Sequence, residues 1–284
     1  MKVGIVFEGG AYRTIFACGV IDALLKNHIY TDYMIGVSAG AGYGVSYATR
    51  QYKRNLKIIM RYCDDKRYLS FKNWFKKDNR SIFGLDFVYN KVPNELILFD
   101  YDAYLKNGVD FICVGTNTDT GKAEYFPFDP DDKNMVTLQA TCALPLLFPK
   151  ITLNGKQYWD GGITDPIPFK KAFLDGCDKV IVVSTREKYY RKKDNNRLKH
   201  LLPLFHKNTE LVKALSNFRN NYNETVEELE QYEAEEKVFV FRPKTTKGFD
   251  MMERDRKKLL TMYNDGYKQT IRRLDDLKEY LSSN

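Results

Sequence analysis

Met34-Ile35-Gly36-Val37-Ser38-Ala39-Gly40-Ala41-Gly42 is a short apolar run that breaks at a serine, with a glycine two residues away on each side. Where this G-x-S-x-G pattern joins a strand to a helix, it places the serine on a sharp, strained turn that exposes the hydroxyl group. Residues 32–37 predict a buried strand, and residues 39–49 predict a helix of small residues whose free N–H groups point at the serine. Ser38 is therefore a candidate nucleophile, and an ordinary glycine-containing turn between strand and helix is the alternative.

The chain opens with the same succession of strand, glycine-rich loop and helix. A buried strand is predicted at residues 3–7 and a helix at residues 15–26, and Glu8-Gly9-Gly10-Ala11-Tyr12-Arg13 lies between them. A dinucleotide-binding loop would need glycines at positions 9, 11 and 14, and this chain has alanine and threonine at the last two. Successive backbone N–H groups are also what an oxyanion hole requires. In a parallel sheet this loop opens on the same edge as the Ser38 turn, so we expect the two to lie together.

Strands and helices alternate through the first 185 residues, which is typical of an α/β protein. The other elements predicted in this part are strands at residues 109–117, 122–126, 151–153, 156–159 and 179–184, and helices at residues 51–65, 134–143 and 166–174. Apolar residues recur at helical spacing in residues 211–229 and 260–281, with a short strand at residues 238–241 between them. We expect one domain, with an α/β core over residues 1–185 and a basic, then helical, C-terminal part over residues 186–284 packed on it.

Composition excludes several classes of protein. With 43% hydrophobic and 14% aromatic residues, the chain can build a substantial core. Its first ten residues hold too short and too acidic an apolar run for a secretory signal, and no stretch reaches the roughly 18 apolar residues of a membrane span. A net charge of +8 favours anionic partners in general, but no nucleic-acid-binding motif is present. The cysteines are scattered, which predicts a cytoplasmic protein without a disulfide framework, metal site or cofactor; they are Cys18, Cys63, Cys113, Cys142 and Cys177.

A serine nucleophile needs a base within hydrogen-bond reach of its hydroxyl group. None of the histidines sits at the end of a predicted strand; they are His28, His200 and His206. Asp160 does follow the strand at residues 156–159, and the two glycines after it allow backbone to approach closely. Burial of this carboxylate against the nucleophile turn would raise its basicity toward what proton abstraction requires. The sequence therefore predicts a dyad of Ser38 and Asp160.

Together these motifs resemble the patatin-like phospholipase family, and more narrowly its bacterial branch. The resemblance rests on the glycine-rich loop at residues 8–13, the serine turn at residues 36–40, the Asp160-Gly161-Gly162 turn, and the passage at residues 140–149 ahead of that aspartate. The resemblance covers residues 1 to about 185. The segment from residue 186 onward resembles only the bacterial branch, and weakly. It implies a three-layer α/β/α fold with a mainly parallel central sheet and a helical C-terminal part. It also implies hydrolysis of acyl esters in phospholipids, lysophospholipids or neutral lipids, without a histidine base and without calcium.

The resemblance also implies roles at the site. Ser38 and Asp160 would be the catalytic residues, and the amides of the oxyanion hole would come from Gly9, Gly10, Ala11 and Ala39. The family pattern has glycines at positions 11 and 14; alanine at position 11 still supplies an N–H group but restricts φ. Two alternatives stay open, namely a soluble carboxylesterase, thioesterase or acyltransferase on the same fold, and a lipid-binding protein that has lost the chemistry.

Two further segments admit two interpretations each. Residues 68–93 mix aromatic residues with lysines without clean periodicity, which predicts either a cover over the site or an ordinary loop packed on the core. Residues 186–205 are basic and end in an apolar cluster, which suits peripheral contact with an anionic membrane. The alternative is a solvated loop whose apolar end packs against the helix at residues 211–229. The basic residues of this segment are Arg186, Lys188, Arg191, Lys192, Lys193, Arg197 and Lys199.

Overall fold

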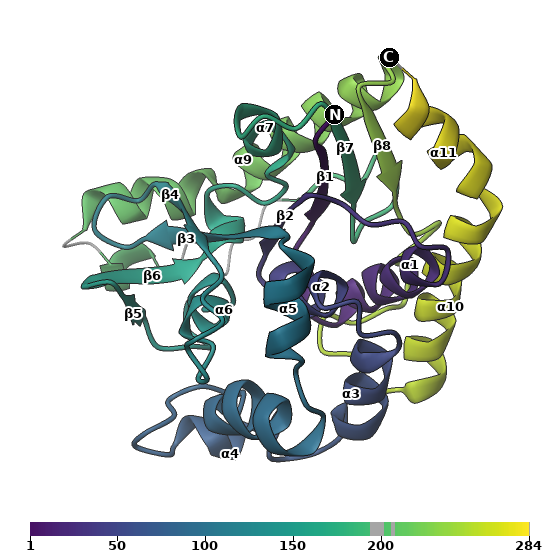
Figure 1. Ribbon diagram of the computed structural model, residues 1–284. Coiled ribbons are helices and arrows are strands. Elements are labelled where there is room, and N and C mark those ends of the chain that lie inside the picture. Colours follow the sequence, from purple (N-terminus) through teal and green to yellow (C-terminus); the bar gives the residue numbers. More distant parts are fainter. Residues whose placement is uncertain (194–201, 206–207, 284) are drawn as a thin grey trace.

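One mixed β-sheet runs through the protein (Figure 1). The computed structural model describes residues 1–193, 202–205 and 208–283. Within these residues the strands follow the order β5-β6-β3-β2-β1-β7-β8, and β4 also pairs with β3. The strands are β1 (Val3–Phe7), β2 (Tyr33–Val37), β3 (Asp110–Asn117), β4 (Ala123–Pro127), β5 (Ile151–Leu153), β6 (Lys156–Asp160), β7 (Lys179–Val183) and β8 (Val238–Phe241). The neighbouring strands β3, β2, β1, β7 and β8 are parallel to one another. In contrast, β4 and β6 pair antiparallel with β3, and β5 pairs antiparallel with β6.

Alternating side chains along the strands create an apolar core on each face of the sheet. In β1, Ile5 and Phe7 belong to one core and Val6 belongs to the other. In β8, Phe239 lies in the first core and Val240 in the second. Because both faces are covered, the central strands are continuous apolar runs, which is the pattern that the sequence shows.

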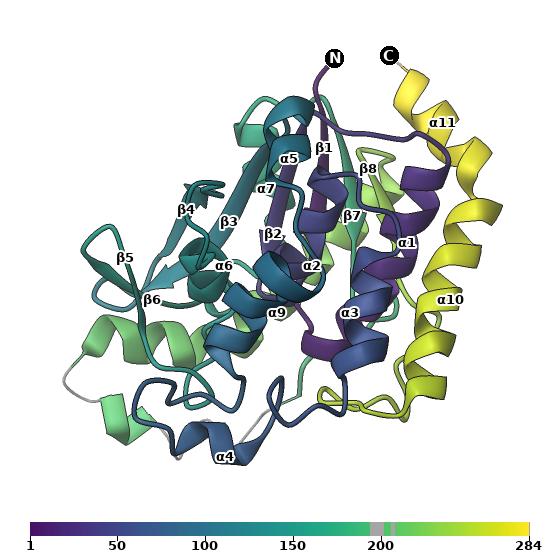
Figure 2. The same ribbon diagram turned by 60° about the horizontal axis from the view of Figure 1, so that its bottom comes forward.

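Helices cover both faces of the sheet, as the sequence predicted. The helices are α1 (Ile15–Lys26), α2 (Ala39–Ala48), α3 (Arg54–Tyr62), α4 (Phe71–Trp74), α5 (Tyr101–Asn107), α6 (Val136–Thr141), α7 (Phe169–Leu174), α9 (Thr209–Ala234), α10 (Arg256–Arg272) and α11 (Leu274–Ser282). The first core lies under α1, α2, α3 and α10, and α1 and α10 run side by side (Figures 1 and 2). The second core lies under α7 and α9.

The C-terminal part contributes to the same sheet and to both cores. β8 pairs parallel with β7, α9 packs on the second core, and α10 packs on the first. The α/β fold with a helical C-terminal part is therefore confirmed. The boundary at residue 185 stays a prediction. No helix in the described part of the chain is both long and apolar enough to cross a membrane.

The elements between β2 and β3 were the least predictable from sequence. The pattern did not indicate α5, which is capped at its N-terminus by Asp100, whose side chain accepts the Ala103 N–H at 2.8 Å. Residues 68–93 hold α4 and most of a π-helical segment, Phe87–Leu96, that contains Pro93. A proline inside a helix interrupts its regular hydrogen bonding, so the apolar spacing in this segment does not follow a single period.

The order of the central strands places three loops beside one another. β1 lies between β2 and β7, so the loop after β1 is flanked by Ser38 after β2 and by Ser184 and Thr185 after β7. β6 lies on the other side of β3 and ends at Asp160, which pairs with Gly115. Parallel strands present their carboxyl ends at one edge of a sheet, where α/β proteins bind ligands.

Candidate active site

Ser38 occupies a strained backbone conformation at the end of β2. Its φ of 54° and ψ of −132° lie outside the regions that a non-glycine residue normally adopts. Its backbone N–H donates to Thr141 Oγ1 at 2.9 Å, which holds the turn in place. The neighbouring glycines are needed because a Cβ on Gly36 would lie 2.6 Å from Ala41 Cα, and one on Gly40 would lie 2.7 Å from the Glu8 carbonyl oxygen. The strained serine of the G-x-S-x-G pattern is therefore present.

The glycine-rich loop lies directly against Ser38. A Cβ on Gly9 would stand 2.9 Å from Ser38 Cβ, so the loop comes this close only because residue 9 has no side chain. Ala11 adopts a φ of 50° and begins a single 3₁₀ turn, Ala11–Thr14. The free amides are those predicted for the oxyanion hole: within the described residues no hydrogen bond is donated by the backbone N–H of Gly9, Gly10, Ala11 or Ala39.

Two buried residues, Glu8 and Thr185, fix the position of this loop through hydrogen bonds, and the sequence analysis predicted neither role. Glu8 is 2% exposed, and its Oε2 accepts the Thr185 N–H at 2.6 Å. Its Oε1 accepts the hydroxyl of Tyr222, a residue of α9, at 2.9 Å. The Thr185 hydroxyl then donates to the Gly9 carbonyl oxygen at 3.0 Å. The loop after β1 is thereby fastened to β7 and to the C-terminal part of the chain.

Asp160 lies beside Ser38 and is almost fully buried, at 3% exposure. Burial raises the pKa of its carboxyl to about 6, and the Ser38 hydroxyl and the Gly162 N–H oppose part of this rise. Asp160 Oδ1 accepts the Gly162 N–H at 2.8 Å. Oδ2 is buried, and no hydrogen bond of good geometry reaches it from the described residues, although the Ser38 hydroxyl is close enough to affect the pKa. A carboxylate oxygen is thus free to accept a proton next to the candidate nucleophile.

The passage between α6 and β5 connects the serine turn with Asp160. Thr141 accepts the Ser38 N–H, and the Ala143 carbonyl oxygen accepts the Asp160 N–H at 2.9 Å. Cys142 between them contacts Ser38 and Tyr89, and burial raises the pKa of its thiol to about 12. That thiol is therefore neutral at physiological pH and does not compete as a nucleophile. The motif at residues 140–149 was noticed in the sequence, but these contacts were not predictable from it.

An apolar cavity of about 120 Å³ opens beside Ser38 on the α2 side of the sheet. Its walls come from Ala39 and Tyr43 of α2, from Ile58 of α3, and from residues of α6. Part of the wall comes from the segment that was expected to cover the site, namely Tyr68, Phe83, Val88, Tyr89, Val92 and Pro93. Residues 68–93 therefore line the cavity and also pack on the core, so both interpretations of this segment describe part of it, and its role as a cover over a catalytic site stays a prediction. A cavity of this character suits a hydrocarbon chain.

The described part of the chain offers no histidine for the site. His28 follows α1, where its ring forms a hydrogen bond of 3.1 Å with the Tyr30 hydroxyl at the surface. His200 and His206 lie outside the described residues. A strained serine, a buried carboxylate with a free oxygen and a loop of free amides are the parts that acyl transfer requires.

The fold and the site together define an α/β protein with a strained serine, a buried carboxylate and a glycine-rich loop at one edge of its sheet. The chain belongs to the patatin-like phospholipase family, whose model matches residues 5–173. A second family model, described as a domain of unknown function, matches residues 208–282.

Relatives of the chain include proteins of bacteria and yeast. It is 29% identical over 189 residues to the uncharacterized protein YjjU of Escherichia coli strain K12, covering 65% of this chain and 52% of that protein. It is 25% identical over 194 residues to lysophospholipase NTE1 of Meyerozyma guilliermondii, covering 64% of this chain and 12% of that protein. The matched region thus spans about half of the first relative and a small part of the second. Among solved structures, VipD from Legionella pneumophila aligns with a TM-score of 0.46 and 14% identity, over 97% of this chain and 67% of that chain.

A side chain at position 10 should damage the loop without touching Ser38. A Cβ on Gly10 would lie 2.6 Å from Thr185 Oγ1, the hydroxyl that holds the Gly9 carbonyl oxygen. We expect Gly10→Val to displace the loop amides and to cost about 2–4 kcal/mol of transition-state stabilisation, measured as kcat/KM on an acyl ester. The control is Lys106→Ala, at an exposed position of α5. An unchanged kcat/KM for Gly10→Val would place the oxyanion hole elsewhere.

Proposed function

We propose that the protein is a serine lipid acyl hydrolase of the phospholipase A or lysophospholipase type. In this proposal Ser38 is the nucleophile, Asp160 is the base, and the amides of Gly9, Gly10, Ala11 and Ala39 form the oxyanion hole. The reaction needs no calcium, because the charge that develops on the substrate oxygen is stabilised by backbone N–H groups. The observation that carries the proposal is the buried Asp160 carboxyl, with one free oxygen beside the strained serine and the apolar cavity.

The proposed mechanism has two halves. In the first, Ser38 Oγ forms a bond to the ester carbonyl carbon while its proton passes to Asp160 Oδ2. The tetrahedral oxyanion collapses, the alcohol leaves, and the alcohol oxygen takes the proton from Asp160. In the second half, water attacks the acyl-enzyme and gives its proton to Asp160, which returns it to Ser38 as the fatty acid leaves. One carboxylate thus acts as base and acid in turn.

A panel of acyl esters tests the proposal. Purified protein is given lysophospholipids, diacyl phospholipids, monoacylglycerols, short soluble esters and acyl thioesters, and fatty acid release is measured with and without EDTA. We expect release from lipid esters by the native protein, insensitive to EDTA. Turnover of soluble esters or thioesters alone would favour the alternative enzymes on this fold. Binding of lipid without turnover would favour the silent lipid-binding protein.

The pH dependence should report Asp160. Only the ionised carboxylate can accept the serine proton, so activity is absent below the pKa of Asp160 and present above it. We expect kcat/KM for an uncharged ester to rise tenfold per pH unit below a midpoint at about 6 and to level off above it. A midpoint near 4 would mean that the carboxyl is solvated in the working enzyme, and a flat profile from pH 5 to 8 would remove Asp160 as the base.

A further inference from the structure

An ester bound at Ser38 has two parts that must lie on different sides of the scissile carbonyl. The apolar cavity lies on the side of α2 and α3, among residues of the first core such as Val45 and Ile58. We place the acyl chain of the substrate in this apolar cavity. The alcohol part of the substrate then faces the opposite side, toward β7 and α9, where Tyr222 of the second core contacts Glu8.

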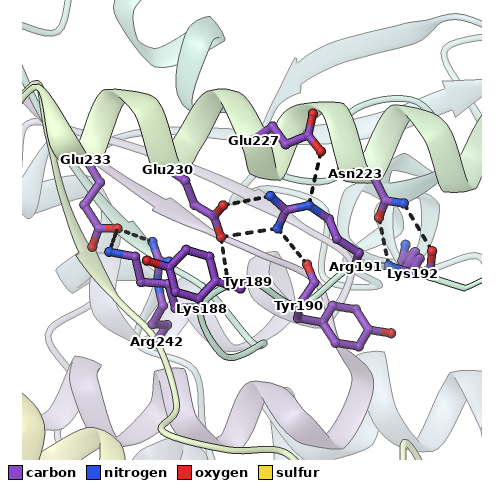
Figure 3. A network of polar contacts seen from close by, with 10 residues as sticks. All are labelled: Lys188, Tyr189, Tyr190, Arg191, Lys192, Asn223, Glu227, Glu230, Glu233 and Arg242. Atoms are coloured by element: carbon purple, nitrogen blue, oxygen red, sulfur yellow. Dashed lines mark hydrogen bonds and ion pairs between the residues drawn. The ribbon is translucent and has the colours of Figure 1, made fainter.

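Two cations of the basic segment, Lys188 and Arg191, form ion pairs with acidic residues of α9 (Figure 3). Lys188 Nζ lies 3.5 Å from a carboxylate oxygen of Glu233. Arg191 pairs with Glu230 at 2.7 Å and with Glu227 at 3.4 Å. Leu202 and Phe205, at the far end of the segment, pack against the core, and the Phe205 ring lies 5.0 Å from that of Trp159. The packing interpretation of this segment is therefore confirmed for its described residues; membrane contact stays a prediction, and Arg197 and Lys199 lie outside the described residues.

Lys192 differs from Lys188 and Arg191 because its ammonium group lies over two aromatic rings and forms no ion pair with a described residue. Its backbone is held by Asn223, which accepts the Lys192 N–H at 2.8 Å and donates to the Lys192 carbonyl oxygen at 3.1 Å (Figure 3). The Nζ atom lies 3.6 Å from the ring centre of Phe218 and 3.9 Å from that of Tyr222. Two ring faces hold the cation in place without supplying a negative charge.

Tyr222 links Lys192 to the glycine-rich loop after β1. The Lys192 ammonium group lies over the Tyr222 ring, and the Tyr222 hydroxyl donates to Glu8, the residue directly before Gly9. The charge of Lys192 also lowers the pKa of Asp160. A second cation lies close by: the Arg186 guanidinium stacks 4.2 Å above the ring of Tyr190, whose centre is 6.2 Å from that of Tyr222.

The acids around these two cations are already engaged. Both oxygens of Glu8 accept hydrogen bonds, from Thr185 and Tyr222. Glu187 is held by the backbone and hydroxyl of Thr246. Burial lowers the pKa of Lys192 to about 7; Glu8 and Asp160 oppose this, whereas Arg13 and Arg186 add to it. An anion placed beside Lys192 would favour the protonated form of its amino group.

We propose that Lys192, with Arg186 as the second cation, binds a phosphate group in the alcohol part of the substrate. The inference rests on the proposed hydrolase function and assigns to it the two residues that would select phosphate-bearing lipid esters over neutral ones. The acyl chain enters the apolar cavity on one side of Ser38, and the phosphate meets the ammonium and guanidinium groups on the other. Charged hydrogen bonds to phosphate give both affinity and selectivity.

A pair of esters with the same acyl chain tests the site. Lysophosphatidylglycerol and 1-monoacylglycerol, each below its critical micelle concentration, give the ratio of kcat/KM with and without the phosphate. We expect Lys192→Met, which keeps an apolar stem between the two rings, to lower this ratio by roughly tenfold or more, mainly through KM for the phosphate ester. Lys192→Arg should retain most of the ratio. Lys193→Met, at the exposed neighbouring position, is the matched control, and thermal unfolding checks that all variants are folded.

The outcomes separate this inference from the function on which it rests. A wild-type protein that hydrolyses neither ester would overturn the proposed function itself. A wild-type protein that hydrolyses both, with the same ratio in Lys192→Met and Lys193→Met, would overturn only the phosphate site. Inorganic phosphate is added in a separate arm. If it inhibits monoacylglycerol hydrolysis through Lys192 while the ratio is unaffected by Lys192→Met, the site binds the free ion and the assignment to a lipid headgroup is wrong.

Discussion

Replacing Ser38 by alanine is expected to reduce ester hydrolysis by roughly three or more orders of magnitude, because the acyl-enzyme can no longer form. The residual rate would come from the loop amides, which still bind the oxyanion while water attacks directly. The fold should survive, since alanine keeps the Cβ of serine at the strained turn and removes only the hydroxyl oxygen. The measurement is kcat/KM on a lysophospholipid, alongside thermal unfolding of both proteins.

Two observations sharpen the Ser38 experiment. A fluorophosphonate reagent should add one covalent label to the wild-type protein, found at Ser38 by mass spectrometry, and none to Ser38→Ala. The control is Ser216→Ala, on the exposed side of α9, where the hydroxyl only returns to the Val212 carbonyl oxygen at 2.8 Å. A Ser38→Ala protein that keeps a near-native rate would remove this serine as the nucleophile.

The second large effect is expected at Asp160, where substitution should lower the activity and raise the stability of the folded protein. Asp160→Asn should lower kcat/KM by about three orders of magnitude, because an amide oxygen cannot take the serine proton at a useful rate. The same substitution should stabilise the folded protein at pH 8, because the native site holds an ionised carboxylate that burial disfavours. The pKa of about 6 against 3.8 for a free aspartate corresponds to about 3 kcal/mol of unfolding free energy.

The sign of this stability effect follows from the raised pKa. A carboxyl whose pKa is higher in the folded state than in the unfolded state costs stability at all pH values above the folded pKa. The cost decreases as pH falls from about 6 toward 4 and is gone below about 3.8, where the carboxyl is protonated in both states. We therefore expect the denaturation midpoints of Asp160→Asn and wild type to differ at pH 8 and to converge near pH 4.

The matched control for Asp160 is Asp165→Asn. Burial also raises the pKa of Asp165, but its carboxylate accepts the Tyr125 hydroxyl at 2.7 Å and belongs to no part of the proposed dyad. This variant should keep most of the hydrolytic activity. Equal losses of activity in the two variants would mean that the Asp160 effect is structural, and near-native activity in Asp160→Asn would exclude the dyad.

Local chemistry along the chain was enough to locate several elements and the two candidate catalytic residues. The helix predicted at residues 15–26 is α1 with the same bounds, and the strand predicted at residues 32–37 begins one residue later as β2. Ser38 was visible because a sharp turn between strand and helix needs small residues at fixed distances from it. Asp160 was visible because a carboxylate at a strand end is followed by two glycines.

The partners of these residues could not be found in the same way, because they are distant in the chain. Thr141 lies 103 positions from Ser38, whose turn it holds; Thr185 lies 177 and Tyr222 lies 214 positions from Glu8. No local pattern distinguishes these side chains from other buried threonines and tyrosines. The same holds for Lys192. In the sequence it is one of several cations in a basic segment, and only its packing against α9 places it near the glycine-rich loop.

Local patterns in the chain therefore specify the candidate nucleophile, the candidate base and the two glycine turns, since each depends on neighbours within a few positions. The support of the loop, the shape of the acyl cavity and the direction of Lys192 depend on which strands are adjacent. Packing of two apolar cores against one sheet established the order β3-β2-β1-β7-β8. That order brings the ends of β2, β1 and β7 together, and it is a property of the whole chain and not of any single segment.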